Sequence, residues 1–467
     1  MNTFSRTLDL EKRAHELETE AQAPPAPRSI KDTGLTEEAV VEMLLKTLYV
    51  QGARQGEQVA SAMRLPFPLI DELLMSLQQR RFVEVLGTEG HGRGGYRFDL
   101  TSEGRARARE ALTLSGYVGP MPVSLASFRE WVRRQSVRSQ RVASERIREG
   151  FSDLVLPASV LEALGPAVNY GRSLFLYGHP GNGKTAVAER IAQLMGGSLF
   201  LPYAVDVDGE TMVVFDPVHH TVVDEEEDAV GGMLRPAVDR DHRFVHIRRP
   251  TVFVGGDLTM PQLDLQYDPV AKFYAAPFQV KAAGGVLIID DFGRQMVTPK
   301  ELLNRWIVPL EKEVDFLSLH TGLKFPVPFD TLLVFATNLD PADLVDEAFL
   351  RRINYKIHVG SPGRAEWEEI FSDVCTERGI PFEREALDAV FKKYYDRYGI
   401  HPRGCHPRDI VDHLEAIAQY EGGEARLTPE YLDRSCRSYF LVMAPDALDR
   451  ASVTGAVGVD PDAKSAS

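Results

Sequence analysis

Hydrophobic positions near the start of the chain change from helical to strand spacing. Val40, Val41, Leu44, Leu45, Leu48 and Tyr49 recur every three or four residues, which predicts an amphipathic helix. Further elements follow in a definite order: helices near residues 57–63 and 68–80, strands at 82–86 and 96–100 around a glycine-rich tip, and a helix near 102–112. Three helices and then a β-hairpin predict a winged-helix-like α+β domain over residues 36–115.

The middle of the chain, residues 151–360, alternates apolar strand-like runs with helical segments. This alternation predicts an α/β fold with a parallel sheet and crossover helices. Residues 361–443 are helical in pattern, and both Ser361-Pro362 and Thr428-Pro429 are typical of an N-cap followed by a first-turn proline. The remaining segments are expected to be a flexible N-terminal segment (1–35) made of a short polar helix and an extended linker (23–28), an Arg-rich connector (116–150) and a disordered tail (444–467).

One glycine-rich segment has the pattern G-x-x-x-x-G-K-[ST]. It lies between an apolar run and a helix-forming run, and consists of Gly178, His179, Pro180, Gly181, Asn182, Gly183, Lys184 and Thr185, with Ala186 next. Backbone N–H groups of such a loop and of the following helix N-terminus bind phosphates, and side chains would obstruct them. Lys184 is expected to contact the β- and γ-phosphates, and Thr185 to bind Mg²⁺. The segment predicts a nucleoside triphosphate site over residues 178–186.

Two further apolar runs end in polar residues. Residues 285–289 are followed by Asp290 and Asp291, and residues 329–337 by Asn338. An acid at the end of a buried parallel strand beside the P-loop can hold Mg²⁺ through water, and the next acid can polarise an attacking water. Asn338 can orient that water. Between the two runs, residues 298–301 (Thr-Pro-Lys-Glu) form a capping box that opens a helix at 299–311.

In this order, the motifs resemble those of AAA+ ATPases over about residues 150–443. The resemblance implies an AAA+ core with a C-terminal helical lid, ATP and Mg²⁺ as ligands, and a homo-oligomeric ring that is usually hexameric. It makes Asp290 the magnesium-side acid, Asp291 the catalytic acid and Asn338 the first sensor. AAA+ proteins usually have Glu where this chain has Asp291, and the shorter side chain predicts slower turnover.

The resemblance also assigns roles to arginines. Arg351 or Arg352, in the run 346–352, resembles the arginine finger that acts on the neighbouring subunit's nucleotide. The alternative is that these arginines only bond carbonyl groups at a helix end. Arg408, ahead of an apolar helix, resembles the second sensor of the lid. Residues 151–157 would lie near the adenine by analogy.

Lys184 and Asp290 are 106 residues apart, about twice the spacing usual in AAA+ cores, so the resemblance implies an insertion of roughly 50 residues within about residues 199–283. Phe273 and Tyr274 could grip a threaded polymer at a central pore, or could belong to the core of the insertion. His219 and His220, near two acids, suggest a metal site only weakly, because adjacent side chains point apart on a strand.

Composition excludes several classes of protein. A net charge of −15 argues against a protein that coats nucleic acid non-specifically. The sequence has no apolar run long enough for a membrane span and no secretion signal at its start. Its three cysteines, Cys375, Cys405 and Cys436, fit neither a zinc site nor a disulfide framework, so a cytoplasmic location is expected.

The sequence does not identify the macromolecule on which the expected ATPase acts. Asp71 and Glu72 lie at the start of the helix that would read DNA, where phosphate contact favours positive charge, so protein docking is favoured over DNA. The connector's arginines fit a solvated helix or a docking surface for an acidic partner or nucleic acid: Arg133, Arg134, Arg138, Arg141, Arg146 and Arg148. We expect an ATP-hydrolysing remodeller of a protein client or adaptor, with a DNA-associated ATPase or a slowly hydrolysing nucleotide switch as alternatives.

Overall fold

The computed structural model describes residues 23–88, 92–223, 240–344 and 350–440. The chain divides into two compact units. The first contains residues 1–149, 164–176 and 188–357, and the second contains residues 150–163, 177–187 and 358–467. The P-loop segment therefore belongs to the same unit as the C-terminal helices. Among the described residues, no helix combines the length and apolarity needed to cross a bilayer.

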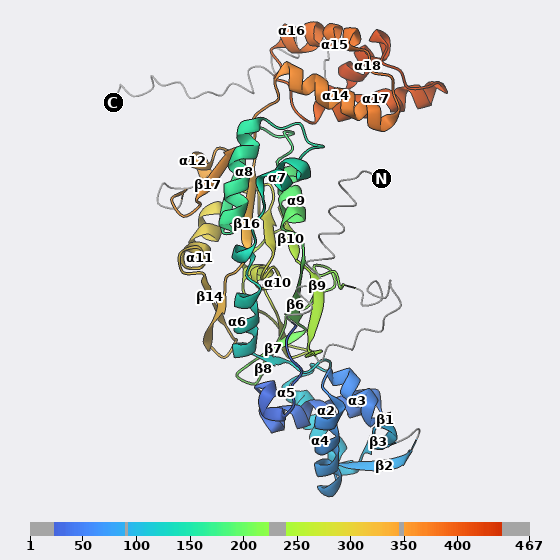
Figure 1. Ribbon diagram of the computed structural model, residues 1–467, viewed down its shortest axis with the longest axis vertical. Helices are drawn as coiled ribbons and strands as arrows, with labels where there is room; N and C mark the ends of the chain where they lie inside the picture. Colours follow the sequence, from blue (N-terminus) through green and yellow to red (C-terminus); the bar gives the residue numbers. More distant parts are fainter. Residues whose placement is uncertain (1–22, 89–91, 224–239, 345–349, 441–467) are drawn as a thin grey trace. The chain divides into compact units, whose positions relative to one another are not determined.

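A five-stranded sheet forms the centre of the first unit and confirms the predicted α/β class (Figure 1). Its strands run in the order β10 (Thr251–Val254), β13 (Val286–Ile289), β16 (Leu332–Thr337), β5 (Ser173–Tyr177) and β17 (Tyr355–His358). β10, β13 and β16 pair in parallel. All residues of β13 and β16 are buried, as expected for strands covered on both faces.

Helix α11 (Pro299–Lys312) packs against this sheet. The predicted capping box is present: Thr298 accepts from the Glu301 backbone N–H at 3.3 Å, and the Glu301 carboxylate accepts from the Thr298 N–H at 3.2 Å. Trp306, fully buried, contacts the aromatic rings of Phe329 and Phe335. Other helices of the central region are α6 (Leu125–Arg134), α7 (Ser144–Gly150), α8 (Ala158–Tyr170), α9 (Lys184–Met195), α10 (Phe278–Lys281) and α12 (Pro341–Leu344).

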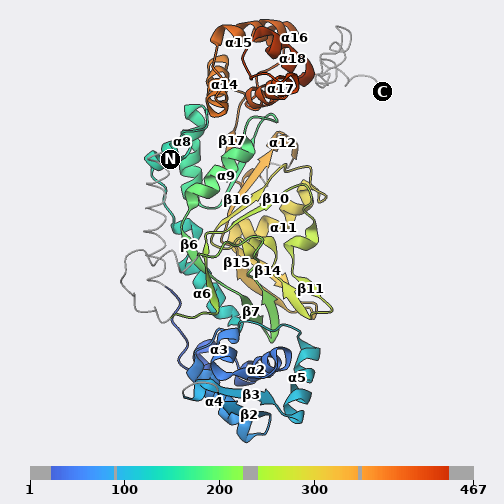
Figure 2. The same cartoon turned by 90° about the vertical axis from the view of Figure 1, so that its right-hand side faces the viewer.

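The elements expected at residues 36–115 occur in the predicted order, as a compact group of helices and short strands (Figure 2). An antiparallel sheet in the order β1-β3-β2 packs with the helices around one core. The elements are α2 (Glu37–Gln51), β1 (Arg54–Gln55), α3 (Gly56–Met63), α4 (Phe67–Gln79), β2 (Val83–Thr88), β3 (Tyr96–Leu100) and α5 (Ser102–Leu114).

The connector and the insertion build a second core together. A mixed sheet has the order β11-β12-β8-β7-β4, and β4 comes from the segment expected to be a connector. From that same segment, α6 contributes Phe128 and Trp131 to the core of the insertion. The strands of this sheet are β4 (Val123–Ser124), β7 (Ala204–Val207), β8 (Glu210–Val213), β11 (Gln266–Asp268) and β12 (Phe273–Ala275). Two further antiparallel pairs lie outside it: β6 (Ser198–Pro202) pairs with β9 (Phe244–Arg248), and β14 (Val314–Ser318) pairs with β15 (Lys324–Pro328).

Of the aromatic pair of the insertion, Tyr274 belongs to this core. Tyr274 is only 1% exposed and its hydroxyl bonds His320 Nδ1, so it is not available to grip a polymer. Phe273 contacts the Tyr117 ring edge-on at 6.0 Å. The side chain of His220 is also structural: Nδ1 accepts from the Asp216 N–H, so Nε2 donates to the Lys281 carbonyl. The described residues contain no group of three or more metal-ligand side chains.

A buried arginine fixes the segments on both sides of the N-terminal domain. Arg243 is 2% exposed and pairs with Asp241 at 2.7 Å. Its Nη1 also donates to the carbonyl oxygens of Thr33 at 3.1 Å and Pro122 at 3.3 Å. The proline-rich run expected to be a free linker is docked as well, because the Asp241 N–H donates to the Pro24 carbonyl at 2.7 Å. Residues 23–35 are therefore part of the fold.

The C-terminal helices form their own core around Trp367, Phe371 and Leu414. Thr428 caps α18 with Pro429 in the first turn, as predicted. The Ser361-Pro362 cap is wrong, because α14 starts at Arg364 with Gly363 as N-cap. The helices are α14 (Arg364–Arg378), α15 (Arg384–Val390), a π-helical turn (Phe391–Tyr395), α16 (Asp396–Tyr398), α17 (His406–Glu421) and α18 (Pro429–Tyr439). The expected tail at 444–467 lies outside the described residues.

Candidate nucleotide-binding site

The glycine-rich segment connects β5 to α9, the strand–loop–helix context expected for a P-loop. Gly178, Gly181 and Gly183 have φ angles of 144°, 81° and 80°. Residues other than glycine rarely adopt these conformations, so each position needs glycine for backbone reasons alone. The turn they produce leads directly into α9, whose N-terminal backbone N–H groups favour bound anions.

Two of the three glycines are also required by close packing. A Cβ atom on Gly178 would lie 2.3 Å from the Val359 carbonyl oxygen, and one on Gly181 would lie 2.5 Å from Cys405 Sγ. A Cβ atom on Gly183 would face open space, with no neighbouring atom of the described residues within 4 Å. The loop therefore has a packed side against residues 359 and 405 and an open side at Gly183. An open cradle of backbone beside a helix N-terminus fits a phosphate chain.

Lys184 is buried, 6% exposed, and its ammonium donates to the His179 carbonyl at 2.8 Å. This bond keeps the positive charge within the loop. Thr185 and Ala186 follow in the first turn of α9, whereas His179 and Pro180 are exposed at the loop tip. The arrangement supplies the cation that a polyphosphate requires, on the chain segment that the sequence predicts.

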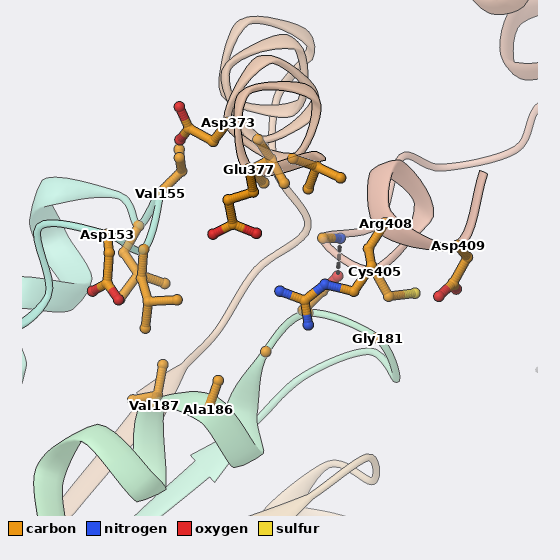
Figure 3. A pocket seen from close by; sticks show the side chains of 17 residues that line it. Asp153, Val155, Gly181, Ala186, Val187, Asp373, Glu377, Cys405, Arg408 and Asp409 are labelled. Carbon is orange, nitrogen blue, oxygen red and sulfur yellow. Dashed lines mark hydrogen bonds between the residues drawn. The ribbon is translucent and has the colours of Figure 1, made fainter. Parts of the chain in front are cut away.

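A pocket of about 320 Å³ lies beside the loop in the second unit (Figure 3). Its walls are mainly apolar: Leu154, Val155, Leu156, Val187, Ile370 and Val374. The P-loop contributes Gly181, Asn182, Gly183 and Ala186 to the same pocket. An apolar slot with a few polar groups is the usual form of a small-molecule binding site. The segment expected near the adenine, residues 151–157, thus contributes residues 153–156.

The C-terminal helices contribute charged residues to this pocket. Arg408 of α17 lines it, so the predicted second-sensor residue and the P-loop share one cavity. Sequence reasoning missed Glu377 and Asp373 of α14 and Cys405. Figure 3 shows the Glu377 carboxylate directed into the space between residues 153–156 and Arg408. The four-residue spacing of Asp373 and Glu377 on one helix was the signal that could have identified them.

The predicted acids occupy the sheet of the first unit. Asp290 follows β13, and its N–H donates to the Val254 carbonyl at 2.9 Å. Asp291 is exposed, with a φ of 49°, and its carboxylate accepts from Asn338 Nδ2 at 2.8 Å. The strand order places β16, which carries Asn338 at its end, between β13 and β5. The structure therefore joins Asp291 and Asn338, the two residues expected to handle the attacking water.

The two candidate finger arginines differ in their surroundings. Arg352 is held within the chain, because its Nε donates to Glu311 Oε1 at 2.6 Å. Arg351 is exposed, and among the described residues it forms no ion pair. The preceding residues 346–349 lie outside the described part of the chain. Of the two, Arg351 is the more exposed.

Comparisons with known proteins give limited information. Residues 363–438 match the profile of a domain of unknown function (DUF8689). The chain matches no curated protein. It is similar in structure to a point mutant of Thermotoga maritima RuvB, with 14% identity, a TM-score of 0.32, and coverage of 65% of this chain and 72% of that one.

Two further solved structures give similar values. For the Thermotoga maritima RuvB Holliday junction branch migration motor, the identity is 16% and the TM-score 0.31, over 65% of this chain and 72% of that one. For NtrX from Brucella abortus, the identity is 13% and the TM-score 0.34, over 70% and 64%. Such low scores support no functional argument, so the function is argued from the chain's own residues.

A buried histidine next to the pocket gives the C-terminal helices a pH dependence. Burial lowers the pKa of His406 from 6.5 to about 4, with Arg403 lowering it further and Asp409 opposing. Its Nδ1 lies 2.9 Å from the Tyr395 hydroxyl. Between pH 6.5 and 4, the unfolded chain binds a proton at this position and the folded chain does not. Stability of these helices must therefore fall as the pH falls.

We expect the free energy of local unfolding at α17 to decrease by up to about 1.4 kcal/mol per pH unit between pH 6.5 and 4 because of His406. Hydrogen exchange of α17 amides in the full chain measures this. The variant His406→Gln removes the titrating group, so its pH slope should be smaller than that of the wild type. Equal slopes for the two proteins would contradict the assignment.

Proposed function

We propose that this protein is an AAA+-type ATPase that binds ATP beside the P-loop, hydrolyses it to ADP and phosphate, and uses the reaction to remodel a protein client. The observation that supports this most is the shared pocket of P-loop, residues 153–156 and Arg408. A phosphate cradle continuous with an apolar slot matches the two ends of a nucleoside triphosphate. An arginine from the C-terminal helices in the same cavity supplies positive charge near the phosphates.

The residues have distinct roles in the proposed reaction. Lys184 binds the β- and γ-phosphates by charge, and the loop backbone donates hydrogen bonds to their oxygens. Thr185 and Asp290 would hold Mg²⁺, and when bound there it would neutralise charge on the transferred phosphoryl group. Asp291 accepts a proton from the attacking water, and Asn338 orients the carboxylate through the observed 2.8 Å bond.

The proposed turnover is slow, because Asp291 is constrained. Its carboxylate is one methylene shorter than that of the usual glutamate, and its backbone has a positive φ of 49°. A shorter side chain reaches less far toward the water, and its carboxylate already accepts a hydrogen bond from Asn338. This supports regulated hydrolysis, and it keeps a nucleotide-dependent switch as the second candidate.

We further propose a homo-oligomeric ring, with six subunits as the expected number, in which Arg351 contacts the nucleotide of the neighbouring subunit. An arginine finger must be free to leave its own chain's surface. Arg351 meets this requirement, whereas Arg352 is paired with Glu311. The finger then stabilises negative charge as the phosphoryl group is transferred.

A protein client is favoured over DNA by the ion pairs of the N-terminal domain. Arg93, near the tip of the β2–β3 hairpin, pairs with Asp71 at the start of α4 at 3.1 Å. Arg105 pairs with Asp99, and Arg107 with Glu38 and Glu42. Cations engaged in this way gain less from DNA phosphates, since the existing pairs must first be broken.

Two substitutions should separate binding from hydrolysis. Lys184→Ala removes a phosphate-binding charge, so the dissociation constant for ATP should rise. Asp291→Asn keeps the shape and loses the base, so ATP should still bind while phosphate release falls by on the order of 10²-fold or more. A fluorescent ATP analogue and a phosphate-release assay measure the two effects. Lys300→Ala, at an exposed lysine of α11, is the matched control. Turnover within about threefold of wild type for Asp291→Asn would assign the base elsewhere.

The finger assignment can be tested with the neighbouring arginine as control. Arg351→Ala should reduce turnover by about 10³-fold while ATP binding persists. Arg352→Ala should retain most of the activity, because its partner is Glu311. Mixing Arg351→Ala with Lys184→Ala protein should restore part of the activity, since some mixed interfaces combine an intact finger with an intact P-loop. Full turnover by Arg351→Ala alone is the contradicting result.

Duplex binding distinguishes the protein client from the DNA alternative. We expect weak or no shift of a DNA duplex by the full chain at physiological salt, because of the chain's −15 charge and the paired arginines. Titrations at several salt concentrations measure the affinity and its salt slope. Sub-micromolar, sequence-selective binding with a steep slope, lost in Arg93→Ala, would support the DNA-associated ATPase instead.

A further inference from the structure

Asn182 is a P-loop residue whose side chain is engaged by two other segments. It is 6% exposed. Its Nδ2 donates to Ser361 Oγ at 3.2 Å and, more weakly, to the Val359 carbonyl at 3.4 Å. Its Oδ1 accepts from the Gly404 N–H at 3.4 Å. Phosphate binding by a P-loop uses backbone N–H groups and the lysine, so it does not by itself require a buried amide here.

The two segments that Asn182 joins each lead into one of the C-terminal helices. Residues 359–361 lead from β17 into α14, and residues 403–405 lead into α17, which carries Arg408. Backbone bonds reinforce both contacts: the Cys405 N–H donates to the Gly181 carbonyl at 2.7 Å, and the Val359 N–H donates to the Tyr177 carbonyl at 2.8 Å. The loop thus lies between the entry to the lid and the helix of the lid arginine.

The contact with residues 403–405 is tight. A Cβ atom on Gly404 would lie 3.3 Å from the Gly181 carbonyl oxygen and 3.6 Å from Asn182 Cα. Together with the missing Cβ of Gly181, this permits backbone-to-backbone packing. This close packing leaves little room for the loop backbone to move independently of residues 403–405.

We propose that Asn182 is a positioning residue that couples phosphate binding at the P-loop to the position of residues 403–405 and hence of Arg408. The inference rests on the proposed function and adds its regulation: the occupied loop sets the lid through this amide. Coupling is reciprocal, so displacing the lid loop must weaken nucleotide binding by the same factor as nucleotide strengthens the lid contact.

Hydrogen exchange of the Gly404 and Cys405 amides in the full chain, with and without a slowly hydrolysed ATP analogue, tests the coupling. In the wild type, the analogue should slow exchange of both amides. In Asn182→Ala, this nucleotide-dependent protection should be lost, and the affinity for the analogue should fall by on the order of tenfold, as for the loss of one to two hydrogen bonds. Ser361→Ala removes a single partner and is the matched control, with small effects expected.

A second variant changes the same contact at Gly404, in the segment that leads into α17. Gly404→Ala leaves the P-loop sequence intact and should reproduce both effects of Asn182→Ala. The double variant should be little worse than either single variant, because all three lose one shared contact. Additive effects, or normal nucleotide-dependent protection in Asn182→Ala, would overturn the proposal. If the wild type fails to bind the analogue, the proposed function fails and the inference with it. If the wild type binds and only the coupling is missing, the proposed function stands.

Discussion

The glycine-dependent packing of the P-loop is the constraint on which the site depends. Gly178 and Gly181 lack side chains where the Val359 carbonyl and the Cys405 sulfur approach, so the loop is pressed against the segments that lead into the C-terminal helices. The same backbone presents its open side at Gly183. The proposed phosphate-binding side and the side packed on residues 359 and 405 thus belong to one short stretch of chain. Through this packing, the loop falls in the same compact unit as the C-terminal helices.

Local sequence was sufficient for several features whose interacting residues are close in the chain. The apolar run 173–177 is the strand β5, and the capping box of Thr298 and Glu301 starts α11 as predicted. The pattern G-x-x-x-x-G-K-[ST] identified the loop because its residues are contiguous. Ser361 shows the limit of such reasoning: it has the sequence of a helix cap, but its hydroxyl accepts from Asn182. A distant partner competed with the local one.

Contacts between distant segments could not be predicted from one sequence. Tyr274 and His320 are 46 residues apart, so nothing near Tyr274 indicated its buried hydrogen bond. Likewise, the pocket combines residues 153–156, the P-loop and two C-terminal helices, and only folding shows that Glu377 and Arg408 face the same space. The difference between Arg351 and Arg352 also needed the structure, since it depends on Glu311, 41 residues from Arg352. The roles of these residues in catalysis remain predictions.

The hydrogen bonds of Arg243 limit where the chain can be cut into separately folding fragments. It binds Thr33 and Pro122, which are 210 and 121 residues away in opposite flanks of the N-terminal domain. A fragment that begins after this domain loses the Thr33 acceptor, together with the docked run at Pro24. The guanidinium would keep its ion pair with Asp241, but one of its N–H groups would lose its acceptor. Leaving a buried donor unsatisfied costs folding free energy. The N-terminal domain and the insertion thus belong to one compact unit and share a buried polar anchor.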